Sequence, residues 1–256
     1  MIHPTAIVHE GARIADGVEI GPYAIIGEHV SIGAGTTVGP HTVIEGWTEI
    51  GENNRIFQFA SIGAAPQDLK YRGEKALLKI GDRNTVREFA TLHRGTADGG
   101  GETVVGSDNL FMAYSHVAHD CRIGNQVILA NGATLAGHVE VDDFAILGGL
   151  CAVHQFTRIG AHVMISGGSM VTQDVPPFSI AQGDRAKTVG INQIGLKRRG
   201  FSEEAIRGIK QAYKLIFRSG LRVEEALEQI DAELKGCPEV AEFAAFIRNS
   251  ARGVAR

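Results

Sequence analysis

The sequence predicts a parallel β-helix, in which short strands coil around a triangular prism, and three observations support this prediction. A large apolar residue recurs at every sixth position, first from Ile2 to Leu92 and then, after a shift of one residue, from Val105 to Val171. A small residue such as Ala24 stands four positions after most of these. Glycine frequently follows the large residue directly, as a tight corner requires. A fixed short period indicates a solenoid and excludes an α-helix, whose apolar residues recur every three or four positions.

Three six-residue units make one triangular coil, so each residue lies beneath the residue eighteen positions later, at roughly the 4.8 Å spacing of strands. We expect this β-helix to span residues 1–187. Two segments, 63–79 and 93–104, lack the inward pattern, and we expect each to leave the prism as a loop. Long loops within a compact repeat are often functional.

Residues 188–256 are expected to form a helical domain. Ser202 is a suitable N-cap for a first helix that ends before Gly220, because acidic residues follow it and apolar residues then recur at helical spacing. A second helix is predicted at about 223–234, and a third begins at Pro238. These helices are too short to bury both faces alone, so they should pack on the prism or on another copy of the chain.

Composition limits the classes of function. The 256 residues carry a formal net charge of -4, which argues against general nucleic-acid binding. No apolar run is long enough to span a membrane, and no signal peptide precedes the repeat, so we expect a cytoplasmic protein. The three cysteines form neither a disulfide pattern nor a zinc pattern. A row of basic residues on the first predicted helix is either a solvated face or a docking surface for an acidic partner: Arg207, Lys210, Lys214 and Arg218.

Candidate chemistry lies near four of the ten histidines. Because they stand close to large apolar positions that are eighteen residues apart, successive coils should bring them to one edge of the prism, pointing outward. They are His116, His119, His138 and His154. His119 is the best candidate for a general base, because Asp120 follows it and could orient the imidazole. His154 has an alternative reading as a surface residue, since His3 and His9 occupy the same position of the repeat.

A convex prism offers no pocket by itself. Outward histidines therefore need a second wall, which the 63–79 loop or a neighbouring chain could supply. We expect a homo-oligomer, most simply a homotrimer with sites between its subunits.

Several segments together resemble one known family. They are IGAAPQDLKYRGE, HRGT, HVAHDCRIGN, LANGATLAGHVEVDDFAILGG, VHQF, QDVPP, IAQG and GLKRRGFS. In this order they are similar to the UDP-N-acetylglucosamine O-acyltransferases, which begin lipid A synthesis in Gram-negative bacteria. The resemblance covers the whole chain, and it implies a left-handed coil, no cofactor and no metal.

The resemblance also implies roles for individual residues. His119 would take the proton from the 3-hydroxyl of UDP-N-acetylglucosamine, which attacks the thioester of an (R)-3-hydroxyacyl chain on acyl carrier protein without a covalent acyl-enzyme. Asp120 would hold the imidazole, and the Gly137 N–H would stabilise the oxyanion, a contribution of ~3 kcal/mol. Gly167, with Met164 nearby, would set the accepted acyl length and favour a long chain.

Substrate positioning is implied for the remaining residues. These are Gln67, Asp68, Lys70, His116, His138, His154 and Gln155 around the sugar and acyl head, and Asn192, Arg198 and Arg199 toward the nucleotide. The sequence departs from the family pattern at Ile194, where an acidic residue is frequent, so that nucleotide contact is in question.

Three alternatives stay open at this point. The first is the N-acyltransferase that acts on UDP-3-O-acylglucosamine, although that family carries an N-terminal domain before its repeats. The second is a zinc enzyme of the hexapeptide carbonic anhydrase type, with His116, His119 and His138 as ligands. The third is a non-catalytic scaffold, which would not explain the outward histidines.

Overall fold

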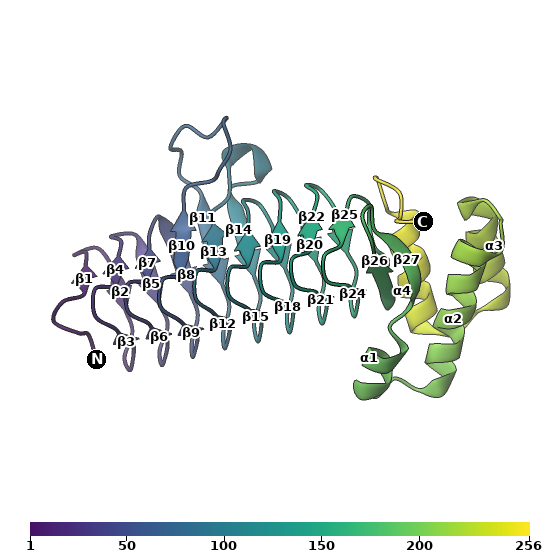
Figure 1. Ribbon diagram of the computed structural model, residues 1–256, viewed down its shortest axis with the longest axis horizontal. Coiled ribbons are helices and arrows are strands. Elements are labelled where there is room, and N and C mark those ends of the chain that lie inside the picture. The colour runs from purple at the N-terminus through teal and green to yellow at the C-terminus, as the bar shows by residue number, and fades with distance from the viewer.

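The computed structural model describes residues 1–256 as a long rod with a cluster of helices at its C-terminal end (Figure 1). The rod is a left-handed parallel β-helix whose strands form three sheets, one for each side of the prism. The predicted fold class is therefore confirmed.

The nine-stranded sheet takes the first strand of each coil. Its members are β1 (Ile7–Val8), β4 (Ile25–Ile26), β7 (Val43–Ile44), β10 (Ser61–Ala64), β13 (Thr91–His93), β16 (His116–Val117), β19 (Thr134–Leu135), β22 (Ala152–Val153) and β25 (Met170–Val171). The eight-stranded sheet follows it in each coil. Its members are β2 (Arg13–Ile14), β5 (Val30–Ile32), β8 (Trp47–Ile50), β11 (Leu77–Ile80), β14 (Glu102–Val105), β17 (Arg122–Ile123), β20 (Glu140–Val141) and β23 (Arg158–Ile159).

The ten-stranded sheet closes each coil. Its members are β3 (Glu19–Ile20), β6 (Thr37–Val38), β9 (Arg55–Ile56), β12 (Thr85–Val86), β15 (Leu110–Phe111), β18 (Ile128–Leu129), β21 (Ile146–Leu147), β24 (Met164–Ile165), β26 (Ser179–Gln182) and β27 (Lys187–Ile191). The pairing is parallel throughout except between β26 and β27, which are antiparallel. The sheet thus continues past residue 187, and a domain boundary at residue 188 stays a prediction.

The inward positions of the repeat form the core. Large residues such as Ile26 and Leu135 and small ones such as Ala24 and Cys151 are almost completely buried, as the period predicts. No helix of the protein combines the length and the apolar character needed to cross a membrane.

Both interruptions of the period are loops, but they are shorter than the sequence suggested. Leu77 pairs with Trp47 thirty positions earlier, and Glu102 pairs with Leu77 twenty-five positions earlier, instead of the eighteen of an uninterrupted coil. The first insertion is thus a multiple of six and keeps the phase, whereas the second shifts it by one. The loop ends expected at 79 and 104 were wrong, because β11 and β14 begin earlier, at Leu77 and Glu102. Leu78, a large residue in a small inward position, hid the strand β11 from the sequence analysis.

Four α-helices follow the prism. The three predicted helices are confirmed as α2 (Glu203–Arg218), α3 (Val223–Glu233) and α4 (Pro238–Arg248), and the Ser202 hydroxyl caps α2 by accepting a hydrogen bond from the Ala205 N–H at 3.0 Å. The short α1 (Gln193–Arg198) was not predicted. These helices bury a separate apolar core.

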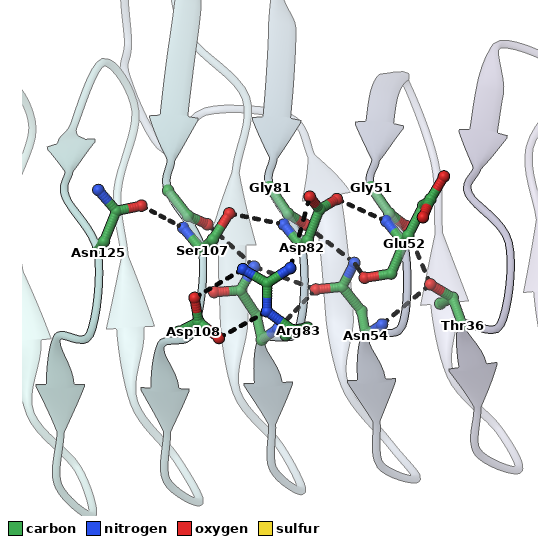
Figure 2. Close-up of polar contacts among 12 residues, drawn as sticks. Thr36, Gly51, Glu52, Asn54, Gly81, Asp82, Arg83, Ser107, Asp108 and Asn125 are labelled. Atoms are coloured by element: carbon green, nitrogen blue, oxygen red, sulfur yellow. Dashed lines mark hydrogen bonds and ion pairs between the residues drawn. The ribbon is translucent and has the colours of Figure 1, made fainter.

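Buried asparagines at Asn54, Asn84 and Asn109, here called the asparagine ladder, replace the small inward residue in three coils (Figure 2). Each side-chain amide bonds along the prism. The Asn84 amide donates to Asn54 Oδ1 at 3.0 Å and to the Gly106 carbonyl at 3.0 Å, and Asn84 Oδ1 accepts from the Asn109 N–H at 2.9 Å. The ladder satisfies buried backbone groups that would otherwise be costly.

Candidate active site

His119, Asp120 and His138 meet at the corner where the nine-stranded sheet turns into the eight-stranded sheet. His119 Nδ1 lies 2.8 Å from Asp120 Oδ2, and His138 Nε2 lies 3.7 Å from the same oxygen. The ring of His138 stands edge-on to His119 and stacks on Phe156 at 4.4 Å. Asp120, His138 and Phe156 are eighteen residues apart and share a positive φ, so they form one column. We call this column, together with the adjacent His119 and Gly137, the histidine corner.

Asp120 is buried and fully hydrogen-bonded. Its carboxylate accepts from the Thr96 N–H at 2.8 Å and from the Thr96 hydroxyl at 2.7 Å, and its own N–H donates to Thr103 Oγ1 at 2.7 Å. Burial would raise the pKa of Asp120, but the hydrogen bonds from His119 and Thr96 outweigh burial and lower it. An ionised carboxylate can only accept, so His119 Nδ1 carries the proton and its Nε2 is left as the base.

Gly137 lies beside the base in the next coil. A Cβ at this position would stand 2.7 Å from His119 Nε2, so any residue other than glycine would clash with the imidazole. The Gly137 carbonyl accepts from the Phe156 N–H at 3.1 Å, whereas the Gly137 N–H makes no hydrogen bond within the chain. A free donor therefore lies next to a free base, as stabilisation of an oxyanion requires.

A second histidine pair lies on the neighbouring strands. His116 Nδ1 is 2.6 Å from the Thr91 hydroxyl, and the ring of His116 stands edge-on to His93 at 4.9 Å. His93 is 4 % exposed, and its Nδ1 has no partner. Burial, with the nearby His116 and His119, lowers the pKa of His93 to about 4, and burial also lowers the pKa of His116.

His93 was missed by the sequence analysis. The strand register aligns Leu92 with Val117, so His93 occupies the position of the repeat that His154 occupies three coils further on. That signal was available, but the inserted residues of the second loop hid it.

His154 and Gln155 are exposed on the coil beyond His138, and no contact joins them to His119. His154 Nδ1 lies 3.0 Å from the Gln155 carbonyl and 3.3 Å from the Arg252 guanidinium. The four histidines of the sequence analysis thus lie along one side of the prism, but only two of them touch.

The first loop carries Gln67, Asp68 and Lys70. The Lys70 N–H donates to Asp68 Oδ1 at 2.9 Å, and the Asp68 carboxylate is near enough to His138 to raise its pKa, against the larger lowering by burial. The Arg94 guanidinium of the second loop holds the first by donating to the Gly63 carbonyl at 2.7 Å and to the Tyr71 hydroxyl at 2.9 Å. The two loops project together from one part of the rod (Figure 1).

The predicted nucleotide residues lie elsewhere in the chain. Asn192 caps α1: its Oδ1 accepts from the Gly195 N–H at 3.1 Å, and its amide donates to the His162 carbonyl at 2.9 Å. The Arg199 guanidinium stacks on Phe144, at the corner between the eight-stranded and ten-stranded sheets, and burial lowers its pKa. Arg198 is exposed in α1. Within a single chain, Asn192, Arg198 and Arg199 therefore do not lie at the histidine corner.

The two acyl-length residues also lie away from that corner. Gly167 is exposed at the turn between the ten-stranded and nine-stranded sheets, and Met164 is half-buried in β24. A Cβ at Gly167 would meet only the backbone of Gly149, at 3.2 Å from the carbonyl oxygen. A larger side chain could therefore project from this position into solvent.

The donor set does not match the three-histidine zinc centre. The ligand atoms that come within 4.8 Å of one another belong to His119, Asp120 and His138, without His116. The Asp120 oxygens already accept hydrogen bonds from His119 and Thr96.

A prism of six-residue repeats with a carboxylate-held histidine and a free glycine N–H at one corner defines a hexapeptide-repeat transferase. The family model of the bacterial transferase hexapeptide (six repeats) matches residues 102–137, and that of UDP N-acetylglucosamine O-acyltransferase domain 2 matches residues 174–255. The chain belongs to the UDP-N-acetylglucosamine O-acyltransferase family, as the sequence resemblance predicted.

Individual relatives match over their full length. The chain is 56% identical, over 100% of itself and 99% of the relative, to the acyl-(acyl-carrier-protein)–UDP-N-acetylglucosamine O-acyltransferase of Janthinobacterium sp. (strain Marseille). The solved UDP-N-acetylglucosamine acyltransferase of Francisella novicida is 46% identical, with a TM-score of 0.97 and coverage of 100% of this chain and 94% of that chain. The O-acyltransferase of Moraxella catarrhalis RH4 is 45% identical, with a TM-score of 0.96 and coverage of 100% and 99%. The protein is thus an acyltransferase.

Proposed function

We propose that the protein transfers an (R)-3-hydroxyacyl chain from acyl carrier protein to the 3-hydroxyl of UDP-N-acetylglucosamine, the first step of lipid A biosynthesis. The observation that carries this proposal is the His119 imidazole, held by Asp120 through Nδ1, with its Nε2 beside the unpaired Gly137 N–H. Family membership supplies the two substrates, and the geometry supplies a base and an oxyanion donor at one point.

The proposed reaction needs no covalent intermediate on the enzyme. His119 Nε2 takes the proton from the sugar hydroxyl, and the oxygen attacks the thioester carbonyl carbon. The tetrahedral oxyanion accepts a hydrogen bond from the Gly137 N–H. As the carbon–sulfur bond breaks, the imidazolium returns its proton to the leaving thiolate, so the histidine ends in its starting state.

The decisive experiment is an acyl-transfer assay with a series of 3-hydroxyacyl carrier proteins, read by mass spectrometry. UDP-N-acetylglucosamine should gain one acyl chain as an alkali-labile ester. Acylation only of the amine of UDP-3-O-acylglucosamine would instead assign the N-acyltransferase reaction, and a 3-amino analogue of the acceptor tests whether oxygen is required. Activity that chelators abolish, with stoichiometric zinc, would favour the zinc alternative.

We further propose a homotrimer in which each site lies between two subunits. The outward residues of the nine-stranded sheet include no lysine, arginine, aspartate or glutamate, in contrast to the charged eight-stranded sheet. They are Ile7, Ile25, Val43, Ser61, Thr91, His116, Thr134, Ala152 and Met170. An uncharged face of this kind suits contact with another copy.

Exposed aromatic residues border the same sheet on its other side. Tyr23, His41, Phe59, Phe89 and Tyr114 stack in succession along that corner, with centroid separations of 4.9 to 5.2 Å. Tyr114 is 64% exposed in the single chain. A neighbouring subunit would cover this row, and it would bring Asn192, Arg198 and Arg199 toward a histidine corner that their own chain does not reach. Sedimentation showing a fully active monomer would contradict the trimer.

Acyl carrier protein is acidic, and we propose that it docks on the basic face of α2. Arg207, Lys210, Lys214 and Arg218 are exposed on this helix. Their attraction for an acidic partner should weaken with added salt, which would raise KM for the carrier protein more than KM for the sugar nucleotide.

The expected cytoplasmic location of the protein stays a prediction.

We propose that Gly167 leaves room for a long acyl chain such as 3-hydroxymyristoyl. The Gly167→Met variant should shift preference toward a ten-carbon donor, because its side chain would project from an exposed position into the space proposed for the acyl chain without disturbing the buried core. Comparison of kcat/KM for ten- and fourteen-carbon donors measures the shift. Equal or better turnover of the ten-carbon donor by the unaltered protein would contradict the proposal.

A further inference from the structure

The second loop reaches back to the histidine corner through a single residue. This loop, residues 94–101, contains the short 3₁₀ helix η1 (Ala97–Gly99), for which Thr96 is the N-cap. Thr96 donates two of the hydrogen bonds that the Asp120 carboxylate accepts, one to each oxygen. The seven inserted residues therefore deliver a buried pair of donors to the carboxylate that holds the proposed base.

We propose that Thr96 is a positioning residue for acyl transfer, which acts through Asp120 to fix the orientation of His119. This inference rests on the proposed role of His119 and deepens it. Thr96 touches neither the imidazole nor any position open to substrate, because it is buried and both its donors point at Asp120.

The geometry leaves Asp120 one arrangement. Its oxygen Oδ1 is held by the Thr96 N–H, and its Oδ2 is shared by the Thr96 hydroxyl and His119 Nδ1. A Cβ at Gly99 would overlap the Asp120 carboxyl group, so the loop packs directly against it. The Gly99 N–H in turn donates to Thr96 Oγ1 at 3.1 Å, which orients the hydroxyl proton toward Asp120.

Such a clamp matters because Asp120 has a competing partner. His138 Nε2 lies 3.7 Å from Oδ2, close enough for a small rotation of the carboxylate to exchange His119 for His138. Fixed donors on both oxygens prevent this rotation. Preorganised second contacts of this kind hold catalytic groups in productive geometry.

The Thr96→Val variant removes the hydroxyl but keeps the volume and the backbone donor. We expect kcat to fall about tenfold or more, because a hydrogen bond to a charged group is lost, while KM for both substrates stays nearly unchanged. Thr96→Ser keeps the hydroxyl and should restore most of kcat. The control is Thr42→Val, which removes another buried threonine hydroxyl, donating to the Phe57 carbonyl at 2.9 Å, far from the site.

The pH profile of kcat distinguishes positioning from a merely structural role. Loss of a donor to the ionised Asp120 leaves its Oδ2 a stronger acceptor for the His119 Nδ1–H, which favours the protonated imidazole. The acid limb of the profile should therefore move to higher pH in Thr96→Val and not in Thr42→Val. The titratable groups that face Asp120 and His119 are His93, His116, His138 and, from the first loop, Asp68, and all are present in both variants.

A double-mutant cycle with Asp120→Asn completes the test. If Thr96 acts through Asp120, the Thr96→Val change should alter kcat by less than about twofold in the Asp120→Asn background. An equal loss in both backgrounds, or wild-type kcat and pH profile in Thr96→Val alone, would overturn the inference. Full activity in His119→Ala would instead overturn the proposed function, so the two failures are distinguishable.

Gly99→Ala probes the same clamp from the other side. Its backbone conformation accepts alanine, so any loss of kcat comes from the Cβ that displaces Asp120. We expect a loss at least as large as that of Thr96→Val, and unchanged kcat would count against the clamp.

Discussion

The asparagine ladder and the histidine corner are two columns of polar side chains on one prism, and they differ in what is left unpaired. In the ladder each amide group finds a partner, so that Asn109 Oδ1, for example, accepts from the Val127 N–H at 2.7 Å. At the histidine corner the carboxylate is saturated, but His119 Nε2 and the Gly137 N–H are not. Saturated groups stabilise a fold, whereas an oriented unpaired group can do chemistry.

The largest expected effect is on turnover at the histidine corner. His119→Ala should lower kcat by ~10²–10⁴-fold, because it removes the proposed general base, and should leave the melting temperature nearly unchanged. Steady-state assays and thermal unfolding measure the two quantities. His29→Ala is the matched control, since His29 is an exposed histidine stacked on Trp47 in another part of the prism. Substantial activity in His119→Ala would contradict the view that the unpaired atoms of the histidine corner carry out the chemistry.

The next effect is on stability at the ladder. Asn84→Ala should cost about 3 kcal/mol of unfolding free energy, because the buried Asn109 N–H and Gly106 carbonyl lose their partners. Urea unfolding measures this free energy. The control Asn125→Ala should lower it far less than Asn84→Ala does, since Asn125 is exposed. The kcat of folded Asn84→Ala should match that of the unaltered protein, and a selective loss of turnover would show that the ladder also supports the site.

A smaller effect concerns His93, the buried histidine behind the corner. Its pKa of about 4 in the folded protein lies below the ordinary value of 6.5, so the unfolded chain binds a proton first as pH falls. Stability contributed by neutral His93 is therefore full above pH 6.5 and is lost as pH falls toward 4, by at most about 3 kcal/mol. In urea unfolding at fixed protein concentration, the free energy of unfolding of His93→Gln should fall less steeply with decreasing pH than that of the unaltered protein. An identical pH dependence in both proteins would show that His93 is not the sensitive group.

The smallest effect belongs to the exposed ion pair beside the ladder. Arg83 Nε lies 2.8 Å from Asp108 Oδ1 at the surface (Figure 2). Asp108→Asn should lower the free energy of unfolding less than either substitution above, and the difference should shrink in high salt. A cost equal to that of Asn84→Ala would mean that surface charge, rather than buried amides, stabilises this corner.

The sequence predicted the site in part, and particular residues show why. The eighteen-residue coil placed His119 near His138, and the order of residues placed Asp120 beside His119. His93 and Thr96 were not placed, because the insertion of seven residues, which is not a multiple of six, hid the register between their coil and that of His119. The path of an inserted loop depends on contacts such as Arg94 with Tyr71, which no repeat encodes.

The amino-acid sequence by itself determined the prism, its register away from the loops, the cap of the first long helix and the family. A strict period leaves one way to bury two side chains in every six. Tertiary structure alone decided which unpaired atoms remain. Whether Thr96 reaches Asp120, whether the Gly137 N–H stays free and how far Arg199 lies from His119 depend on backbone positions brought together from distant coils. Hydrogen bonds form or fail over tenths of an ångström, and local sequence preferences do not specify distances of that size.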